Sequence, residues 1–223
     1  MINRGMNFCM NDENMIQENS HLDYFFEGDK KLNKEQVFHV LEGKELEIVI
    51  ADFSLSDTGF HLTVFLEENC SAIVKLASVC SHSFNKKYIV DIVHNGKKSF
   101  SRTTMSGINS GNGQLRFLGN STILNGASKS DTRQEGRITN LSENAVSEVS
   151  PALLIKENDV KASHGAALGA YNPDSVFYLM SRGLSLQESK KLITIGNIYP
   201  IIESLKDETI VKEAKKYLEA LDL

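Results

Sequence analysis

A long series of short apolar segments, with no helical pattern among them, limits most strongly what this chain can fold into. The series runs from Leu46 to Ile155, and Gly, Asn, Asp or Ser residues separate its members. Within residues 60–66, apolar side chains alternate with His61 and Thr63, which is the period of a half-buried strand. The series therefore predicts an all-β body.

Periodicity alone leaves the arrangement of these strands open among a sandwich, a barrel and a stacked solenoid. The segments expected as strands are 46–50, 60–66, 72–76, 88–93, 115–118, 122–124, 137–141, 146–149 and 152–155. Two observations favour a solenoid. The segments are short, and Asn-Gly hairpin signals do not recur at a regular interval, since 94–97 is the one clear candidate for such a turn.

The pattern changes to helical after Val160. We expect a small-residue loop over residues 162–169, a helix that Pro173 opens and Gly183 closes, and a second helix that begins with a Ser185–Glu188 capping box. Pro200 should bound that helix. A last helix should start near Asp207, because apolar residues recur there at three- and four-residue steps. We thus divide the chain into a loosely ordered N-terminus (1–22), a β core (23–160), and a junction loop with a helical region (161–223).

Composition excludes several classes of protein. The formal net charge of −5 argues against nucleic-acid binding, which normally requires a basic surplus. No apolar run reaches the roughly 18 residues that a membrane-spanning helix needs. The first residues are polar and lack the apolar core of a signal peptide, so we expect a cytoplasmic protein.

The cysteines Cys9, Cys70 and Cys80 contain no Cys-x-x-Cys pair, so neither a disulfide framework nor a four-thiolate site is expected from one chain. Their individual roles stay open, and buried reduced thiols are the simplest interpretation. The glycine-rich stretch 106–113 lacks the lysine of a phosphate-binding loop and opens no helix, so we do not expect ATP hydrolysis by this chain.

His164 is the best candidate for metal chemistry, because imidazole is a common ligand of iron and zinc. One histidine cannot hold a cluster, so the alternative is a hydrogen-bonded residue at the junction between strand and helix. A rival function is a carbohydrate-active enzyme on a β-helix, with Asp57 and the pair Glu67 and Glu68 as acid and base. A purely structural homodimer without a metal role is a further alternative.

Two blocks at a fixed distance stand between residues 159 and 183. They are Asp159-Val160 with Ser163-His164-Gly165-Ala166, and Phe177-Tyr178-Leu179 with Ser181-Arg182-Gly183. This pattern resembles the C-terminal signature of the SufB/SufD family of iron–sulfur cluster assembly proteins. Weaker blocks extend the resemblance back to about His94. Family members often carry Cys two residues before the histidine, where this chain has Ala162, so a thiolate is missing and the chain resembles SufD more than SufB.

The resemblance implies a mostly β fold, a right-handed parallel β-helix (β-solenoid) followed by a small C-terminal helical region. It implies a non-enzymatic scaffold subunit with no stably bound cofactor, in which His164 is a ligand of iron or of a transient iron–sulfur cluster shared with a partner. The implied partners are a SufC-like ATPase and a SufB-like subunit or a second copy, without nucleic acid or membrane. The ATPase would dock on Phe177, Tyr178, Arg182, Gly183, Leu192 and Ile193. The structural alternative is that these residues cap the open end of the solenoid.

Overall fold

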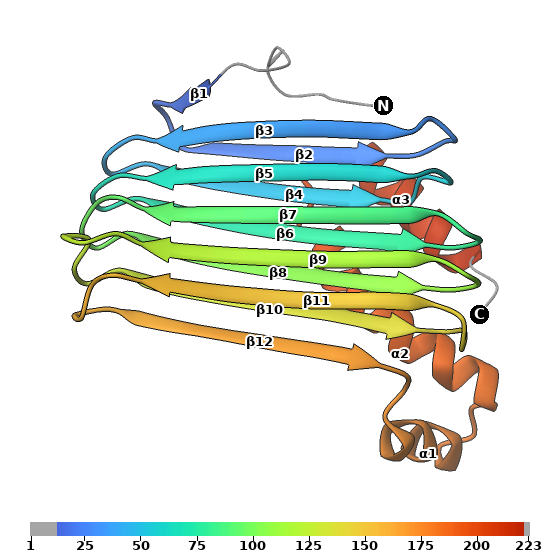
Figure 1. Cartoon of the computed structure of the whole chain (residues 1–223). Coiled ribbons are helices and arrows are strands. Elements are labelled where there is room, and N and C mark those ends of the chain that lie inside the picture. The colour runs from blue at the N-terminus through green and yellow to red at the C-terminus, as the bar shows by residue number, and fades with distance from the viewer. Residues whose placement is uncertain (1–12, 221–223) are drawn as a thin grey trace.

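Two parallel six-stranded sheets face each other and form a β-solenoid, with helices following it (Figure 1). The computed structural model describes residues 13–220. The chain passes from one sheet to the other at each turn, so that the odd-numbered strands form one sheet in the order β1-β3-β5-β7-β9-β11. The even-numbered strands form the second sheet, in the order β2-β4-β6-β8-β10-β12.

Each rung of the solenoid consists of one odd and one even strand. The odd strands are β1 (Glu13–Ile16), β3 (Leu32–Val40), β5 (Thr58–Leu66), β7 (Asn85–His94), β9 (Gln114–Ile123) and β11 (Val146–Ile155). The even strands are β2 (Ser20–Phe26), β4 (Glu45–Asp52), β6 (Ser71–Cys80), β8 (Phe100–Asn109), β10 (Asp131–Asn140) and β12 (Lys161–Gly169). The helices are α1 (Pro173–Ser181), α2 (Leu186–Ile202) and α3 (Glu208–Ala220).

The apolar core lies between the two sheets, because alternate residues of each strand point inward. In β5, Phe60, Leu62, Val64 and Leu66 are all buried, as their alternation predicts. Burial of one such side chain contributes about 1.5–3 kcal/mol, and parallel register repeats the contact from rung to rung. For example, the ring centroids of Tyr88 and Phe117 lie 5.7 Å apart.

One charged cluster is enclosed in this interior. Lys86 Nζ donates to Asp52 Oδ1 at 2.9 Å and to the carbonyl of Ser54 at 2.8 Å, and both charged side chains are fully buried. Tyr88 donates its hydroxyl to Asp52 Oδ2, and burial raises the pKa of Tyr88 well above its usual value. Because each charge has a partner, the cluster avoids the large cost of an unpaired buried ion.

Helices α2 and α3 pack on the outer face of the even-strand sheet, at the carboxyl ends of its strands (Figure 1). Ile198, Ile202, Ile210 and other apolar residues of the helices join one buried cluster with strand residues such as Val49. Tyr217 of α3 stacks on Phe53, with ring centroids 4.9 Å apart. Helices α2 and α3 therefore cover one face of the even-strand sheet.

The solenoid expected from the family resemblance is confirmed, but the reason drawn from strand length was wrong. Most strands have nine or ten residues, and the segments 115–118 and 122–124 belong to one strand, as do 146–149 and 152–155. The turn at 94–97 joins strands of different sheets and is not a hairpin.

The expected boundaries also change. The solenoid begins at Glu13 in β1, earlier than residue 23, whereas residues 1–12 lie outside the described part. The expected junction loop is strand β12, so the β body extends to Gly169. Pro200 lies inside α2, near its end. Within residues 13–220, no helix has the length and apolar character to cross a membrane.

Candidate functional site: the uncovered last rung

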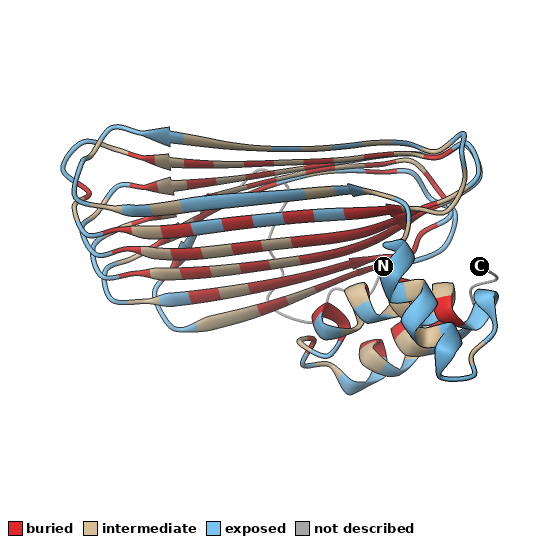
Figure 2. Ribbon diagram, turned by 90° about the horizontal axis from the view of Figure 1, so that it is seen from below, coloured by how far each residue is buried: buried red, intermediate tan, exposed pale blue. Residues whose placement is uncertain are grey.

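The last rung, β11 and β12, has a neighbouring strand on one side only. Among the described strands, β12 pairs with β10 alone and β11 with β9 alone, so one backbone edge of each strand is unpaired. Figure 2 looks at this end from below, and most residues of β11 and β12 are exposed or half-buried. Pro151 in β11 is typical of an edge strand, because proline cannot donate to a sheet ladder.

His164 lies on the face of β12 that corresponds to the interior of the solenoid. It is in register with Gln134 of β10, which is in turn in register with Thr103 of β8, and both of these residues are buried. His164 is exposed because no further rung covers it. The structure thus places the predicted ligand on a sheet edge at the open end and not in a loop.

Ala162 occupies the same face of β12 as His164, because side chains two residues apart in a strand point to the same side. A cysteine at that position would have placed its thiol beside the imidazole. The remaining residues of the face are Ala166 and Leu168, the latter 51% exposed. The site therefore offers one imidazole among small and apolar side chains.

The turn before β12 holds the strand in register. The carbonyl of Asp159 accepts from the amide of Lys129 at 2.5 Å, and the amide of Lys161 donates to the carbonyl of Ser130 at 2.9 Å. These two hydrogen bonds hold the start of β12 against the turn of the preceding rung, and they thereby position the strand that carries His164.

Part of the solenoid interior in the rungs that precede β12 is polar, in register with Ala162. His94 is fully buried, with Nδ1 2.7 Å from Ser99 Oγ and Nε2 2.9 Å from Ser101 Oγ. Ser101 Oγ lies 2.7 Å from Thr132 Oγ1, and Thr132 Oγ1 donates a hydrogen bond to Ser121 Oγ at 2.9 Å. Burial lowers the pKa of His94 to about 4, so this imidazole is neutral at physiological pH. Sequence reasoning missed this column, although the alternation of Ser101 and Thr103 in β8 was a signal for it.

The described cysteines are poor sources of a thiolate. Cys70 and Cys80 are free and buried, and burial raises the pKa of both, in Cys80 to about 11. Cys9 lies outside the described residues. Within residues 13–220, no group of three or more His, Cys, Asp or Glu side chains has an arrangement that could hold a metal ion.

The carboxylates of the carbohydrate-enzyme alternative do not form one site. Asp57 precedes β5 and Glu67 and Glu68 follow it, so a nine-residue strand separates them by about 30 Å. Asp57 accepts from the amide of Asn85 at 3.0 Å, which fixes a turn. The glycine-rich stretch 106–113 forms the end of β8 and a turn into β9, and it opens no helix.

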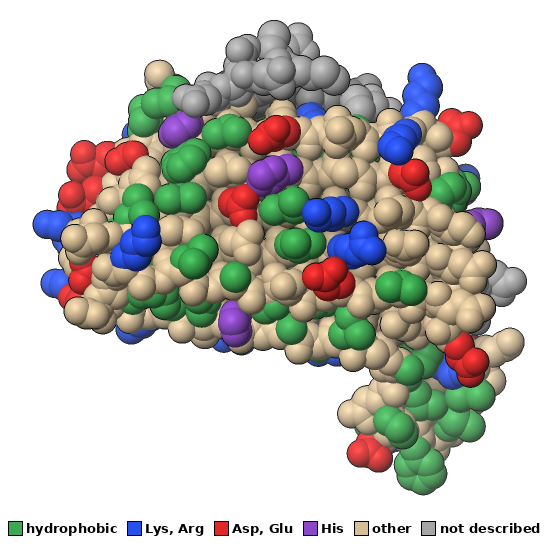
Figure 3. All heavy atoms as spheres, in the orientation of Figure 1, with side chains coloured by type: hydrophobic (Ala, Val, Ile, Leu, Met, Phe, Trp, Pro, Cys, Tyr) green, Lys and Arg blue, Asp and Glu red, His purple; other side chains and the backbone are tan. Residues whose placement is uncertain are grey.

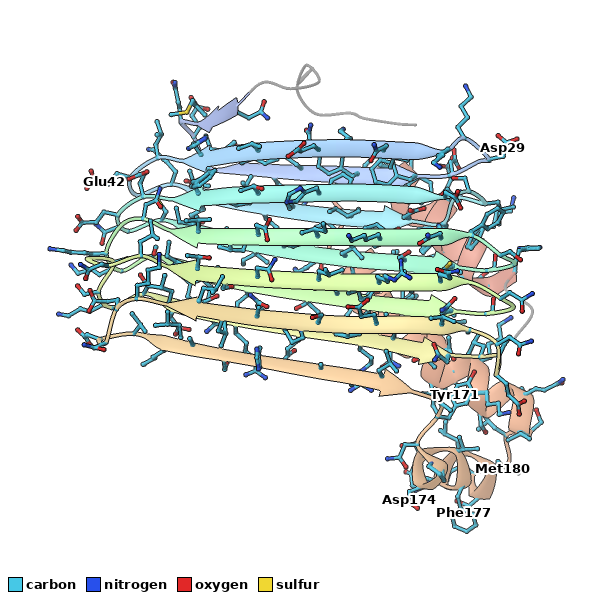
Figure 4. The ribbon with its side chains drawn as sticks, in the orientation of Figure 1. Asp29, Glu42, Tyr171, Asp174, Phe177 and Met180 are labelled. Atoms are coloured by element: carbon cyan, nitrogen blue, oxygen red, sulfur yellow. The ribbon has the colours of Figure 1, made fainter. Side chains whose placement is uncertain are left out.

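Helix α1 carries the second predicted site and projects beyond the solenoid (Figures 1 and 4). It buries none of its residues; Phe177 is 74% exposed and Tyr178 56%. Figure 3 shows the projection largely covered by apolar side chains. We call the exposed residues Phe177, Tyr178, Met180, Leu186 and Leu192 the α1 patch.

The other predicted docking residues flank this patch. The Arg182 guanidinium lies 5.3 Å from the centre of the Tyr178 ring, and the amide of Gly183 donates to the carbonyl of Met180 at 3.0 Å as the helix ends. Ile193 of α2 is half-buried. The capping box at Ser185 and Glu188 is confirmed, and it sets the direction in which α2 leaves the patch.

The comparison with known families agrees with this architecture. Residues 15–197 match the model of the family described as "SUF system FeS cluster assembly, SufBD core domain". The chain belongs to this family of SUF iron–sulfur cluster assembly proteins.

Among individual relatives, the chain is similar to the iron–sulfur cluster assembly protein SufD of Bacillus subtilis, with 34% identity over 134 residues, or 60% of this chain and 31% of the relative. It is 30% identical over 120 residues to SufD of Escherichia coli, covering 54% of this chain and 28% of that protein. The matches thus span about a third or less of these relatives. Both names describe an assembly protein and neither describes an enzyme.

Proposed function

We propose that this chain is a non-enzymatic scaffold subunit of a SUF-type iron–sulfur cluster assembly complex. Family membership supports the role in cluster assembly, and the names of the relatives support a role without catalysis. The observation that carries the proposal is the position of His164 on an unpaired sheet edge. We place the function in the cytoplasm, as the sequence predicts, although one relative carries the name "Protein ABCI7, chloroplastic".

The open end of the solenoid is suited to pairing with a second solenoid. Unpaired strand edges offer N–H and C=O groups to another chain, and an exposed apolar surface favours burial. At this end Ile155 is 43% exposed and Leu168 51%. The partner in this proposal is a SufB-like subunit or a second copy of this chain.

Pairing at this end would bring ligands of the partner to His164. In the proposal, the iron–sulfur cluster is the transient cargo, and His164 supplies one nitrogen ligand while the partner supplies the thiolates. Histidine replaces thiolate in some iron–sulfur centres, so the chemistry is compatible. With Ala162 in place of a thiolate, this chain alone would not nucleate a cluster.

The α1 patch is the proposed docking site for a SufC-like ATPase. Its residues are exposed and belong to no buried cluster, whereas other residues of α2 and α3 are already packed against the sheet. Aromatic side chains with a neighbouring arginine are typical of the centre of a protein interface.

Replacement of Phe177 by Asp tests this docking. The variant should lose at least about tenfold in affinity for a co-expressed SufC-like ATPase, because a charge replaces a large apolar anchor. Its thermal stability should not change, since Phe177 is 74% exposed. Affinity is measured by calorimetry, with Lys212→Glu on the outer side of α3 as a charge control. If the wild-type chain does not bind the ATPase at all, the docking proposal is wrong.

A further inference from the structure

His21 of β2 lies between two carboxylates. Its Nε2 is 2.7 Å from Asp23 Oδ1, and its Nδ1 is 2.9 Å from Glu47 Oε2 of β4. The His21 and Asp23 side chains are only 10% and 8% exposed. The three residues lie on the outer face of the even-strand sheet, next to the turn between α2 and α3.

Each carboxylate connects His21 to that turn. On one side, Asp23 Oδ2 accepts from the amides of Lys206 and Asp207 at 2.8 and 3.2 Å. On the other side, Glu47 Oε1 accepts from Lys75 Nζ at 2.9 Å, and Lys75 Nζ also donates to Ser204 Oγ at 2.9 Å. Two chains of hydrogen bonds, which we call the two arms, thus connect one imidazole to residues 204–207.

Both arms are complete only when each ring nitrogen of His21 carries a proton. A neutral imidazole has one N–H, and its other nitrogen presents a lone pair. That lone pair would face a carboxylate oxygen at 2.7 or 2.9 Å, which is repulsive. The affected carboxylate must turn away, and because its two oxygens belong to one rigid group, it then also loosens its contact on the far side.

Either neutral form therefore disconnects one arm. If Nδ1 keeps the proton, Asp23 turns and the amides of Lys206 and Asp207 lose their acceptor. If Nε2 keeps the proton, the Glu47 carboxylate turns away, and Lys75 Nζ loses the acceptor that orients it toward Ser204 Oγ. In either case the turn loses one of its two connections to the strands, through backbone amides in the first case and through the Ser204 side chain in the second.

We propose that His21 is a proton-operated latch that holds the turn between α2 and α3 against the first rungs of the solenoid. The latch is closed when His21 is doubly protonated, and it opens when the ring loses one of its two N–H protons. The charged groups around it are Asp23, Glu47, Lys75, Glu45 and Lys206, with Asp207 at the turn. A pocket of ≈ 210 Å³ lined by His21, Glu45, Glu47 and Lys206 gives solvent a route to the ring.

The apolar cluster keeps α2 and α3 on the sheet in either state, so the latch governs the turn and not the whole helical region. This inference does not depend on which partner the chain binds, since both sides of the latch belong to this chain.

Amide hydrogen exchange in the full chain tests the latch. The protection factors of the Lys206 and Asp207 amides, which donate to Asp23 Oδ2, should fall about tenfold between about pH 5.5 and about pH 8, the ratio that one charge-assisted hydrogen bond provides. In His21→Gln, whose two N–H donors are on a single nitrogen and not on opposite sides of a ring, they should be low at both pH values. The amide of Val211, which donates to Asp207 within α3, should keep its protection throughout.

The matched control is His61→Gln, because His61 also faces a carboxylate, Asp91 Oδ2 at 2.7 Å, but lies on the opposite sheet. It should behave as the wild type. Equal protection of the Lys206 and Asp207 amides at both pH values in the wild type would overturn the proposal.

If His21→Gln does not fold, nitrogen-15 spectra of the wild-type His21 ring decide the question. They should show two protonated nitrogens under the conditions in which the turn amides are protected. A single protonated nitrogen in that state would contradict the latch.

Discussion

The chemistry available to His164 depends on its position at an edge. A buried imidazole such as that of His94 has both nitrogens occupied by hydroxyls, whereas His164 belongs to a strand whose outer edge is unpaired. An exposed imidazole can bind a metal that another chain brings to it. We therefore expect the contribution of His164 to appear only in the paired complex.

Substitution of His164 by Ala should reduce the iron and sulfide retained after anaerobic reconstitution with a SufB-like partner, by about tenfold if the imidazole is a direct ligand. Iron and acid-labile sulfide are measured per complex. The control is His82→Ala, since His82 is exposed in a turn far from the last rung along the chain. Equal retention in the wild type and His164→Ala would remove the proposed ligand role.

His94 predicts a dependence of stability on pH. The folded chain binds a proton at His94 only near pH 4, whereas an unfolded histidine binds one near pH 6.5. Below about pH 6.5 the unfolded state therefore binds more protons, and the free energy of unfolding falls as the pH falls toward 4. The full effect is about 3 kcal/mol.

Urea unfolding at a series of pH values measures this effect. The decrease between pH 6.5 and 4 should be smaller in His94→Gln than in the wild type, and His82→Gln should match the wild type. Parallel pH profiles for the wild type and His94→Gln would show that His94 does not titrate in this way.

At the scale of elements, the turns of successive rungs lie against one another. At Gly96, a Cβ would collide with the backbone of Glu67 and Glu68 in the turn above. Glycine is required there because two backbones approach closely, and not because of an unusual backbone conformation.

Gly96→Ala should therefore lower the free energy of unfolding by about 3 kcal/mol, the upper range for overpacking. Gly165→Ala on β12 is the matched control, because the nearest atom to its new Cβ would be Glu135 Cγ at 4.0 Å. Chemical denaturation of both variants measures the difference. Equal stabilities would mean that the turn adjusts more easily than the structure indicates.

Elements with regular patterns could be predicted from the sequence. The alternation in β5, the capping box at Ser185 and the amphipathic period of α3 each express one local rule, and each is present in the structure. The solenoid itself could not be chosen by periodicity, because inward and outward alternation is common to every two-layer β fold.

Strands with polar interiors were missed for a physical reason. The sequence does not predict strand β8, because its inward residues include the polar Ser101 and Thr103. The Ser101 hydroxyl is buried with a partner, the Thr132 hydroxyl of β10 at 2.7 Å. β12 reads as a flexible loop because it is rich in Ala and Gly. In both cases the pairing with β10, distant in sequence, decides the conformation.

At the scale of the whole molecule, the unpaired end at β11 and β12 sets the expected assembly. We predict that Leu168→Lys weakens pairing with a SufB-like chain or a second copy by at least about tenfold, because a charge would enter the contact between the two ends. Sedimentation analysis measures it, with Leu55→Lys as the control on an exposed turn between β4 and β5. Unchanged association would direct the search for the interface to another surface.

The return of α2 and α3 to the first rungs has a consequence for how this molecule unfolds. In a plain solenoid, each repeat interacts only with its neighbours, and the terminal repeats fray on their own. Here the amide of Lys206 reaches the carboxylate of Asp23 across 183 residues of sequence, and α3 stacks on Phe53. The first rungs therefore cannot unfold without breaking their contacts with the last helices. We expect the chain to unfold as one cooperative unit, in which residues near the C-terminus stabilise the strands near the N-terminus.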